Sequence, residues 1–440
     1  MFDRSQSTLL LNGVANAGSA ILNSILGFIV VPVLLGVLSA EMYGLWVTAA
    51  SLAVLANCLS FGLRWSLVRE VAAAKLNDVP AGRFLNSAAS LLVVMGMVGA
   101  ALIAGCGLWV ASGLLTLSDG VKAVAPTVFG FVGLMFFADL IGLYPMCILQ
   151  GLQQFVSLNA VLSVAALVRA GGVIVLAMSS RPETLPVVVP MWWCLISFGT
   201  AVALNVVTRR LAPHLTFRPA RLVWSELRPH VAFGMVSQAN SAAGWVLWQS
   251  GVWILSLTAG PASAATYSIG QRIPSAAQLL YWRNADVLFP MASGNREQPD
   301  LIHASLATVT RTNLAMTLPL CAVCWLFAPQ LLQIWIGSSN AEAVWVLRFT
   351  ALAILADATA AGASQVVWAL GFARQYLYTY TSVAVFTAVG TVVAARLQGP
   401  SAAAAVLFVG VGMLAITFLG LASKYLDKPA TSFFTSRRKT

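Results

Sequence analysis

Residues 84–113 read FLNSAASLLVVMGMVGAALIAGCGLWVASG and contain no charged side chain. A helix needs roughly 20 mostly apolar residues to cross the hydrocarbon core of a bilayer, so this segment predicts a transmembrane helix. The whole chain has a similar character. Of its 440 residues, 59% are hydrophobic and 9% are charged. Soluble domains carry roughly 25% charged residues, so the composition indicates an integral membrane protein and argues against a soluble enzyme.

Twelve apolar segments recur along the chain, which predicts an all-α membrane protein with about twelve transmembrane helices. They are 8–37, 42–62, 84–113, 124–149, 155–178, 185–208, 231–258, 262–288, 304–336, 342–369, 375–397 and 401–424. Only two joining loops are long, 63–83 and 209–230. We therefore expect four parts: an N-terminal six-helix lobe (1–208), a basic cytoplasmic connector (209–230), a C-terminal six-helix lobe (231–425) and a basic cytoplasmic tail (426–440).

The positive residues are distributed unevenly between the two sides of this arrangement. The net charge is +11, and with the N-terminus inside, 17 of the 25 Lys and Arg residues fall on the cytoplasmic side. Only Lys122, Arg181 and Arg396 fall outside. Cytoplasmic loops are enriched in Lys and Arg, so this asymmetry predicts a multi-pass protein with both termini in the cytoplasm. Because it explains the charge, we do not expect nucleic acid as a partner.

The two halves of the chain resemble each other. When residues 15–55 are compared with 239–279 at a shift of 224, ten of 41 positions are identical. These include Gly36 with Gly260 and Tyr43 with Tyr267. Each half has an even number of helices and starts on the same side, so we expect two pseudo-symmetric lobes around a central cleft. This is a transporter architecture.

Polar residues line one face of the first helix in each half. Asn12, Asn16, Ser19 and Asn23 recur at spacings of four, three and four, which places them on one helix face. In the seventh segment, a similar stripe contains Gln238, Ser241 and Gln249. Such residues bind a substrate in a wet cavity or hydrogen-bond to neighbouring helices, and the sequence leaves both interpretations open.

Two arginines and two aspartates lie inside apolar segments. A guanidinium matches phosphate or carboxylate oxygens, so Arg272 and Arg169 are candidates for binding an anionic substrate. Asp139 and Asp357 are candidates for coupling transport to an ion or proton. The alternative for the arginines is pairing with these two acids.

Several motifs are absent or uninformative. The chain has no phosphate-binding GxxxxGK[ST] loop and no HExxH zinc motif. Cys321 and Cys324 form a CxxC, but their neighbours are apolar and no histidine lies close in sequence, so we interpret them as small apolar residues. We expect no catalytic residues, no metal and no cofactor.

Four short motifs resemble polysaccharide transporters of the multidrug/oligosaccharidyl-lipid/polysaccharide (MOP) superfamily. The stretch from Leu35 to Trp46, LGVLSAEMYGLW, is similar to their first outer loop. Phe61-Gly62-Leu63 with Arg69-Glu70 resembles their first cytoplasmic loop. Two further stretches resemble the loop between their fourth and fifth helices and its counterpart in the second half: LQGLQQF (149–155) and WALG (368–371) with Arg374.

This resemblance implies a flippase in the bacterial inner membrane that translocates undecaprenyl-diphosphate-linked oligosaccharide for O-antigen, capsule or exopolysaccharide biosynthesis by alternating access. It also implies a cationic cavity between the lobes, with membrane lipids and other polysaccharide assembly proteins as expected partners. Drug exporters of the superfamily often carry an acid in the first helix of a lobe, and segments 8–37 and 231–258 have none. Two alternatives stay open: an ion-coupled multidrug or small-solute antiporter of the same fold, and a membrane-embedded polysaccharide polymerase or ligase.

Overall fold

The computed structural model describes residues 2–56, 60, 62–77, 82–114, 117–181, 183–215, 217–220 and 222–434. The predicted tail therefore lies partly outside the described residues. The chain divides into two compact units, residues 1–239 and 240–440, and the division falls inside a helix, α8 (Trp224–Ala259). Within the described residues all regular structure is helical.

Unit 1 contains six long helices before α8. They are α1 (Phe2–Val37), α2 (Ala40–Ala56), α4 (Gly82–Trp109), α5 (Asp119–Gly151), α6 (Phe155–Ser179) and α7 (Leu185–Leu211). Three shorter elements join them: α3 (Leu63–Asn77), a π-helical turn η2 (Val110–Leu114) and a 3₁₀ turn η3 (Pro213–Leu215).

Unit 2 contains the second half of α8 and five further long helices, one of them broken. They are α9 (Pro261–Asp286), α11 (Pro299–Leu326) with α12 (Ala328–Ile336), α13 (Ala341–Ala369), α14 (Ala373–Gln398) and α15 (Pro400–Leu426). The short helix α10 (Leu288–Gly294) and a 3₁₀ turn η4 (Ala430–Phe433) complete it. The predicted all-α architecture, with six long helices in each half, is confirmed.

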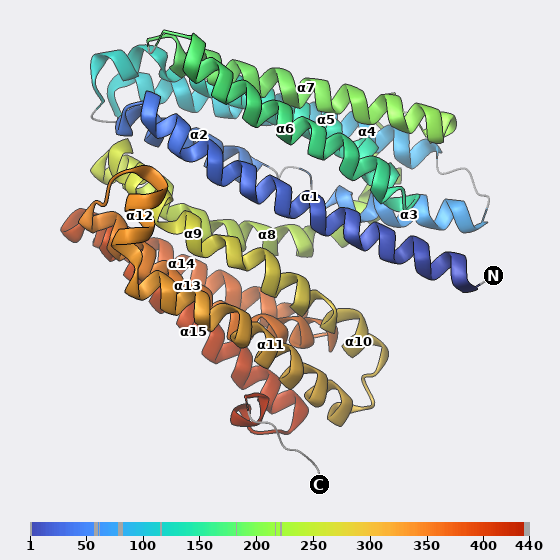
Figure 1. The fold of residues 1–440 in the computed structure, drawn as a ribbon. Coiled ribbons are helices and arrows are strands. Elements are labelled where there is room, and N and C mark those ends of the chain that lie inside the picture. Colours follow the sequence, from blue (N-terminus) through green and yellow to red (C-terminus); the bar gives the residue numbers. More distant parts are fainter. Residues whose placement is uncertain are drawn as a thin grey trace. The chain divides into compact units, whose positions relative to one another are not determined.

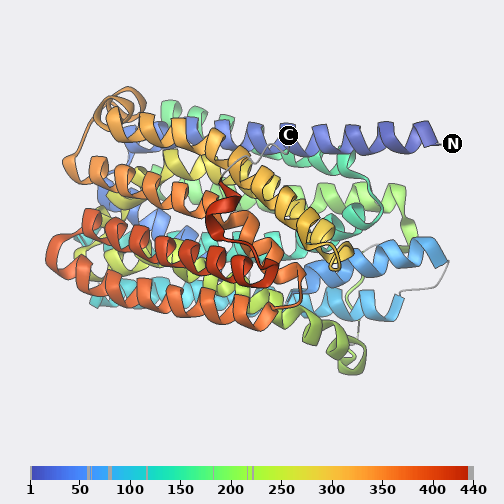
Figure 2. The same cartoon turned by 90° about the horizontal axis from the view of Figure 1, so that it is seen from below.

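One helix lies at the centre of each unit. In unit 1, α5 contacts α2, α3, α4, α6 and α7 (Figure 1). In unit 2, α13 contacts every other described α-helix from α9 to α15, and Figure 2 shows the yellow-to-red helices of this unit running side by side. In the most apolar stretch of α5, 72% of the residues are buried, and in that of α13, 61% are buried. Both fractions are higher than in the other candidate spans. Most side chains of these two helices therefore face protein rather than lipid.

Eight described helices are long and apolar enough to cross a membrane, and α11 with α12 makes a ninth if the bent pair is one span. The helices α2, α8 and α9 do not pass the same test. The described part of α2 is only 17 residues long. Helix α9 carries several polar and charged residues, among them Arg272, Arg283 and Asp286. A polar helix can cross a bilayer only where protein or water, rather than lipid, covers its polar face.

Two expectations about local structure were wrong. Segment 63–83, expected to be a loop, contains the fifteen-residue helix α3. Its residues Leu63, Ser66, Leu67 and Val71 are buried and recur at helical spacing, so α3 packs one face against the unit. A Cβ on Gly151 would lie 2.7 Å from Val71, so only glycine at the end of α5 lets α3 approach this closely. The segment 304–336, expected to be one helix, is bent by 83° between α11 and α12.

The repeat is visible in the helix boundaries, with a small change of register. The α1–α2 boundary and the α8–α9 boundary are 221 to 222 residues apart rather than 224. Tyr43 and Tyr267 are both buried in the helix that follows the boundary. Gly36 lies in the last turn of α1, whereas Gly260 forms the link itself, with a φ of +85° that favours glycine.

Candidate functional site

The two central helices end in the same way, which aligns the two units residue by residue. After α5, Gln153 adopts a positive φ of 59°, and the amide of Gln154 donates to the carbonyl of Leu149. After α13, Gly371 adopts a φ of 98°, and the amide of Phe372 donates to the carbonyl of Val367. This pattern is the Schellman motif that closes many helices.

When the sequences of α5 and α13 are aligned at these C-terminal ends, the two intramembrane acids fall at equivalent positions. Asp139 lies twelve residues before the end of α5, and Asp357 lies twelve residues before the end of α13. The following helices also start in register, because α6 begins four residues after α5 ends and α14 begins four residues after α13 ends. Asp139 and Asp357 are therefore equivalent positions of an internal repeat, which gives a firm basis for comparing their surroundings.

In unit 1, a cation compensates Asp139. Helix α6 places Arg169 close enough for an electrostatic interaction with the Asp139 carboxylate, and Ser197 of α7 hydrogen-bonds to the same carboxylate. Arg169 also donates to the Ser197 hydroxyl at 3.1 Å and lies over the ring of Trp193, 5.4 Å from its centroid. Trp193 in turn packs edge-on against Trp46. Arg169 is thus held inside unit 1 by contacts from α5 and α7.

In unit 2, neutral donors compensate Asp357. The side chain is 3% exposed. The hydroxyl of Tyr281 donates to its Oδ2 at 2.6 Å, and the indole Nε1 of Trp282 donates to the same oxygen at 3.0 Å. Both donors come from α9. Among the residues that the structure describes, no cation forms an ion pair with Asp357.

The difference between the acids has a simple origin in the sequence. The position of α14 that corresponds to Arg169 of α6 is Thr387, because each lies fourteen residues after the start of its helix. Thr387 is buried, and a Cβ on Gly410 of α15 would collide with its Oγ1, so the two helices approach too closely there for an arginine. Tyr281 and Trp282 lie in the C-terminal part of α9. The helix of unit 1 that corresponds to α9 is α2, and its described part ends before the positions equivalent to these two residues.

Arg272 differs from Arg169 in its surroundings. It lies near the middle of α9, and its side chain is exposed. Within the described part of the chain, no hydrogen bond or ion pair involves its guanidinium. The neighbouring Gln271 is buried, at 8% exposure. Arg272 therefore keeps all of its donors for another group.

The polar stripe of α1 is used at least partly for helix packing. Asn159 of α6 donates to the Oδ1 of Asn16 at 2.6 Å. Ser19 is buried, and the exposed Asn23 donates to the Ser19 carbonyl at 2.8 Å. The side chain of Asn12 lies outside the described residues. The bond to Asn159 corresponds to the structural interpretation of Asn16.

The stripe of α8 is divided between the two units. Gln238 belongs to unit 1, where its Oε1 accepts from the amide of Gly62 at 2.9 Å and from the hydroxyl of Ser60 at 3.4 Å. Ser241 and Gln249 belong to unit 2, where Ser241 is exposed and Gln249 is half-buried. Gln238 therefore attaches the segment before α3 to α8.

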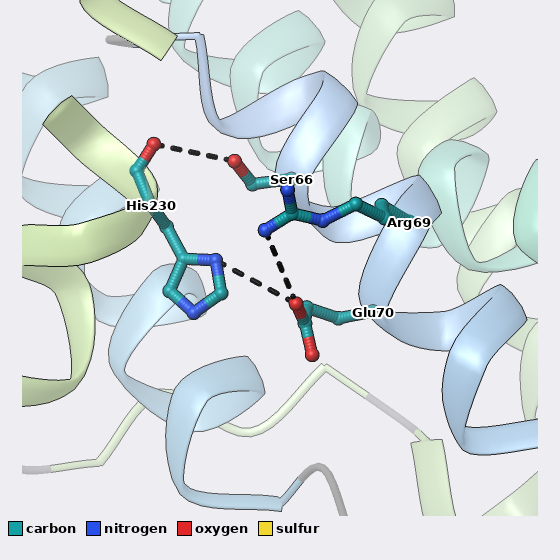
Figure 3. Close-up of polar contacts among 4 residues, drawn as sticks. All are labelled: Ser66, Arg69, Glu70 and His230. Carbon is teal, nitrogen blue, oxygen red and sulfur yellow. Dashed lines mark hydrogen bonds and ion pairs between the residues drawn. The ribbon is translucent and has the colours of Figure 1, made fainter. Parts of the chain in front are cut away.

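A second set of contacts between α3 and α8 surrounds His230, as Figure 3 shows. The hydroxyl of Ser66 donates to the His230 carbonyl at 3.3 Å. Nδ1 of His230 lies 3.8 Å from Oε1 of Glu70, which also pairs with Arg69 at 3.4 Å. The imidazole packs against Phe84 of α4, with ring centroids 3.9 Å apart.

These contacts determine the protonation of His230. Burial lowers the pKa of His230 below its ordinary value. Glu70 and Glu226 act in the opposite direction, and Arg69 reinforces the lowering. The imidazole is therefore mainly neutral at pH 7. Its packing against Phe84 and the bond from Ser66 to the His230 carbonyl hold α8 more than charge does.

Reasoning from the sequence missed the two donors to Asp357 and the polar pair beside them. Nδ2 of Asn284 in α9 donates to Oδ1 of Asn313 in α11 at 2.8 Å, and Asn313 donates to the carbonyl of Ala358 at 3.2 Å. The available signal was the polar character of α9 after Pro274 and the lone Asn313 in an apolar segment. Neither feature indicates which residue is the hydrogen-bond partner, because the donors and acceptors are 29 to 76 residues apart in the sequence.

Several solved structures share this fold. A lipid II flippase, MurJ, in an inward closed conformation is 12% identical with a TM-score of 0.70, and the match covers 96% of this chain and 89% of that protein. An inward-facing multidrug resistance MATE family transporter of the MOP superfamily is 14% identical with a TM-score of 0.61, and the match covers 94% of each chain. A mutant of the Vibrio cholerae MATE transporter VcmN is 15% identical with a TM-score of 0.60, and the match covers 98% of this chain and 100% of that one.

At these identities the comparison establishes the fold of MOP-superfamily transporters. No curated protein matches the sequence. A family model described as "Polysaccharide biosynthesis protein" matches residues 9–295, which is more than half of the chain. The match begins at residue 9, inside α1, covers the rest of unit 1 and continues through α9 and α10 of unit 2. The chain is a multi-pass membrane protein that belongs to the polysaccharide biosynthesis protein family.

Proposed function

We propose that this protein is a flippase that moves undecaprenyl-diphosphate-linked oligosaccharide from the cytoplasmic to the periplasmic leaflet of a bacterial inner membrane. Both termini would lie in the cytoplasm, and the product would enter O-antigen, capsule or exopolysaccharide assembly. Membership of the polysaccharide biosynthesis family and the flippase-like fold support the class of function.

The observation that carries the choice of substrate is the exposed Arg272 in the middle of α9. An intramembrane arginine is costly, and it is usually retained because it meets a partner or a substrate. Arg169 already has Asp139, Ser197 and Trp193 as partners, whereas Arg272 has no bonded partner among the described residues. A diphosphate offers the oxygens that a guanidinium fork binds best.

Asp357 is the better of the two acids for coupling the cycle to an ion or proton. A carboxylate without a paired cation can take up a positive charge, and two donors from α9 hold its Oδ2 in place. Asp139 is already balanced by Arg169. Uptake of a proton or cation at Asp357 would change its bonds to Tyr281 and Trp282 and so the packing of α9 on α13.

An ion-coupled multidrug antiporter is the second candidate, favoured by the likeness to MATE transporters. The two functions predict different effects of Arg272 on the substrate. An unpaired arginine in the site would repel a cationic drug rather than bind it.

The test is export of surface polysaccharide in a flippase-null strain complemented with variants of this protein. Arg272→Ala should abolish export at a normal protein level, and Arg272→Lys should keep part of it because the charge remains but the fork is lost. An interaction with a charged group is worth roughly 1.5–3 kcal/mol, which corresponds to about 10- to 150-fold in binding.

The matched control is Arg311→Ala in α11. Arg311 also lies in a long helix of unit 2, but its Nε donates to the carbonyl of Ala307 in its own helix at 3.0 Å. Its loss should leave most of the export. Full export by Arg272→Ala at normal protein level would remove Arg272 from the substrate site, and resistance to cationic drugs without any export would favour the antiporter.

A further inference from the structure

The connector between α7 and α8 lies against the end of a membrane-spanning helix. The amide of Ala220 donates to the Ser90 hydroxyl at 2.8 Å, and the Ser90 hydroxyl donates back to the Ala220 carbonyl. The amide of Val223 donates to the hydroxyl of Ser87 at 3.3 Å. Because the candidate span of α4 covers Arg83–Ser112, these bonds hold the connector beside the first turns of that span, where lipid headgroups begin.

The side chains of the connector that lie next to these bonds are apolar and exposed. Leu222 and Val223 are each 38% exposed, and Trp224, the first residue of α8, is 55% exposed. The backbone that carries them is held in place by α4. Tryptophan is enriched at the boundary between hydrocarbon and headgroups, where its ring sits at headgroup level.

Exposed arginines lie on both sides of this apolar tip along the chain. Arg209 and Arg210 end α7, Arg218 lies in the connector, and Arg228 lies in the first turns of α8. All four are exposed, and no bond to them is found among the described residues. Between residues 209 and 230 the sequence has a single acid, Glu226. This region therefore combines exposed apolar side chains with exposed arginines, which complements a negatively charged membrane surface.

We propose that this surface, Arg209, Arg210, Arg218, Leu222–Trp224 and Arg228, binds the headgroups of anionic phospholipids at the membrane border of unit 1. Each arginine pairs with a phosphate, and Trp224 with its two apolar neighbours enters the interface. The connector so held would keep the start of α8, whose second half belongs to unit 2, at a constant depth in the membrane. This role is separate from recognition of the transported substrate.

The test measures thermal unfolding of the purified full-length protein in neutral detergent, titrated with phosphatidylglycerol or, separately, with phosphatidylcholine. Phosphatidylglycerol should raise the Tm of the wild type, and phosphatidylcholine should not. Each arginine near an anionic surface contributes roughly fivefold in affinity. The variant Arg209→Gln/Arg210→Gln/Arg218→Gln/Arg228→Gln should therefore need at least about tenfold more phosphatidylglycerol for the same shift.

The control removes the same kind of charge elsewhere. Arg181→Gln/Arg396→Gln alters two exposed arginines outside this surface and should leave the titration unchanged. Trp224→Ser should weaken the response and keep the preference for the anionic lipid. Inorganic phosphate at equal concentration should have no effect, because it offers no interface for Trp224.

An equal response of the quadruple variant and wild type to phosphatidylglycerol would overturn the proposal, as would a wild-type shift produced equally by inorganic phosphate. If the quadruple variant does not fold, the pair Arg209→Gln/Arg228→Gln decides the question by the same titration, with a smaller expected loss of about fivefold or more.

Discussion

Asp139 and Asp357 occupy the same position in the two halves of the molecule, twelve residues before the end of the central helix, yet their surroundings differ. Asp139 interacts electrostatically with Arg169 and accepts a hydrogen bond from Ser197. Asp357 is buried and bonded by the neutral donors Tyr281 and Trp282. One acid of the repeat thus interacts with a cation of its own unit, whereas the other lies among neutral donors in its described surroundings.

The difference shows how a repeat can separate a structural role from a functional one. A buried acid that interacts with a cation is destabilised when that cation is removed, and it cannot take up a further ion without losing this interaction. An acid held by neutral donors can be ionised or neutralised with its bonds rearranged rather than lost. We therefore expect that a change of charge at Asp139 or Arg169 in unit 1 mainly lowers stability, and that a change of charge at Asp357 in unit 2 mainly lowers activity.

The largest effect is expected from Arg169→Ala. It leaves Asp139 without its cation and removes the contacts to Ser197 and Trp193. Breaking a fully buried pair costs about 3–5 kcal/mol, and because Asp139 is accessible we expect about 2 kcal/mol here. For a unit of this size the purified protein should lose about 5 °C in Tm.

The double variant Arg169→Ala/Asp139→Asn separates pairing from packing. Removing the orphaned charge should restore at least half of the lost Tm, because a neutral amide needs no cation. If Asp139→Asn adds to the loss instead, the two side chains do not form a pair, and the comparison between the units fails.

The next effect concerns activity. In Asp357→Asn, the amide oxygen can still accept from Tyr281 and Trp282, so we expect a change in stability below about 1 kcal/mol. The negative charge is gone, however, and export should fall at least about tenfold, which corresponds to roughly 1.4 kcal/mol. Residual export should no longer depend on the pH or sodium gradient. Asp139→Asn is the matched control and should keep that dependence, and coupling that survives in Asp357→Asn alone would transfer the role elsewhere.

The smallest effect is expected from His230 of α8, which lies beside Glu70 of α3. Burial lowers the pKa of His230, so the folded state prefers its neutral form. The stability from this packing is complete above the ordinary histidine pKa of about 6.5 and is lost as the pH falls through the lower folded value. Acidification from pH 7 to pH 5 should destabilise the wild type more than His230→Gln, by less than about 1 kcal/mol because Glu70 partly compensates.

The exposed His214, in η3, provides the control. His214→Gln should show the same dependence of Tm on pH as the wild type. A His230→Gln variant that also matches the wild type over this range would mean that burial of the His230 imidazole does not contribute to the pH dependence of stability.

The sequence predicted the helical elements well because the signal for them is local. Runs of apolar residues such as 84–113 and 401–424 appear in the structure as α4 and α15, with boundaries shifted by a few residues. The helix α3 was missed because its arginines, lysine and glutamate make the segment too polar for a membrane span, and only packing against α5 shows which of its faces is buried. The bend after α11 was missed because the apolar pattern continues through it, although Pro329, two residues after Phe327, marks the first turn of a new helix.

The sequence by itself determined that this chain resides in a membrane, that it carries about twelve long helices and that its two halves are related, because composition and periodicity state these properties directly. It also singled out Arg169, Arg272, Asp139 and Asp357, since a charge in an apolar segment stands out. Only the tertiary structure decided which of them are paired. Arg169 meets Asp139 thirty residues away, Tyr281 meets Asp357 seventy-six residues away, and Arg272 meets neither acid in any described bond. Partners of intramembrane charges are chosen by helix packing, and packing depends on contacts between residues whose separation along the chain carries no signal.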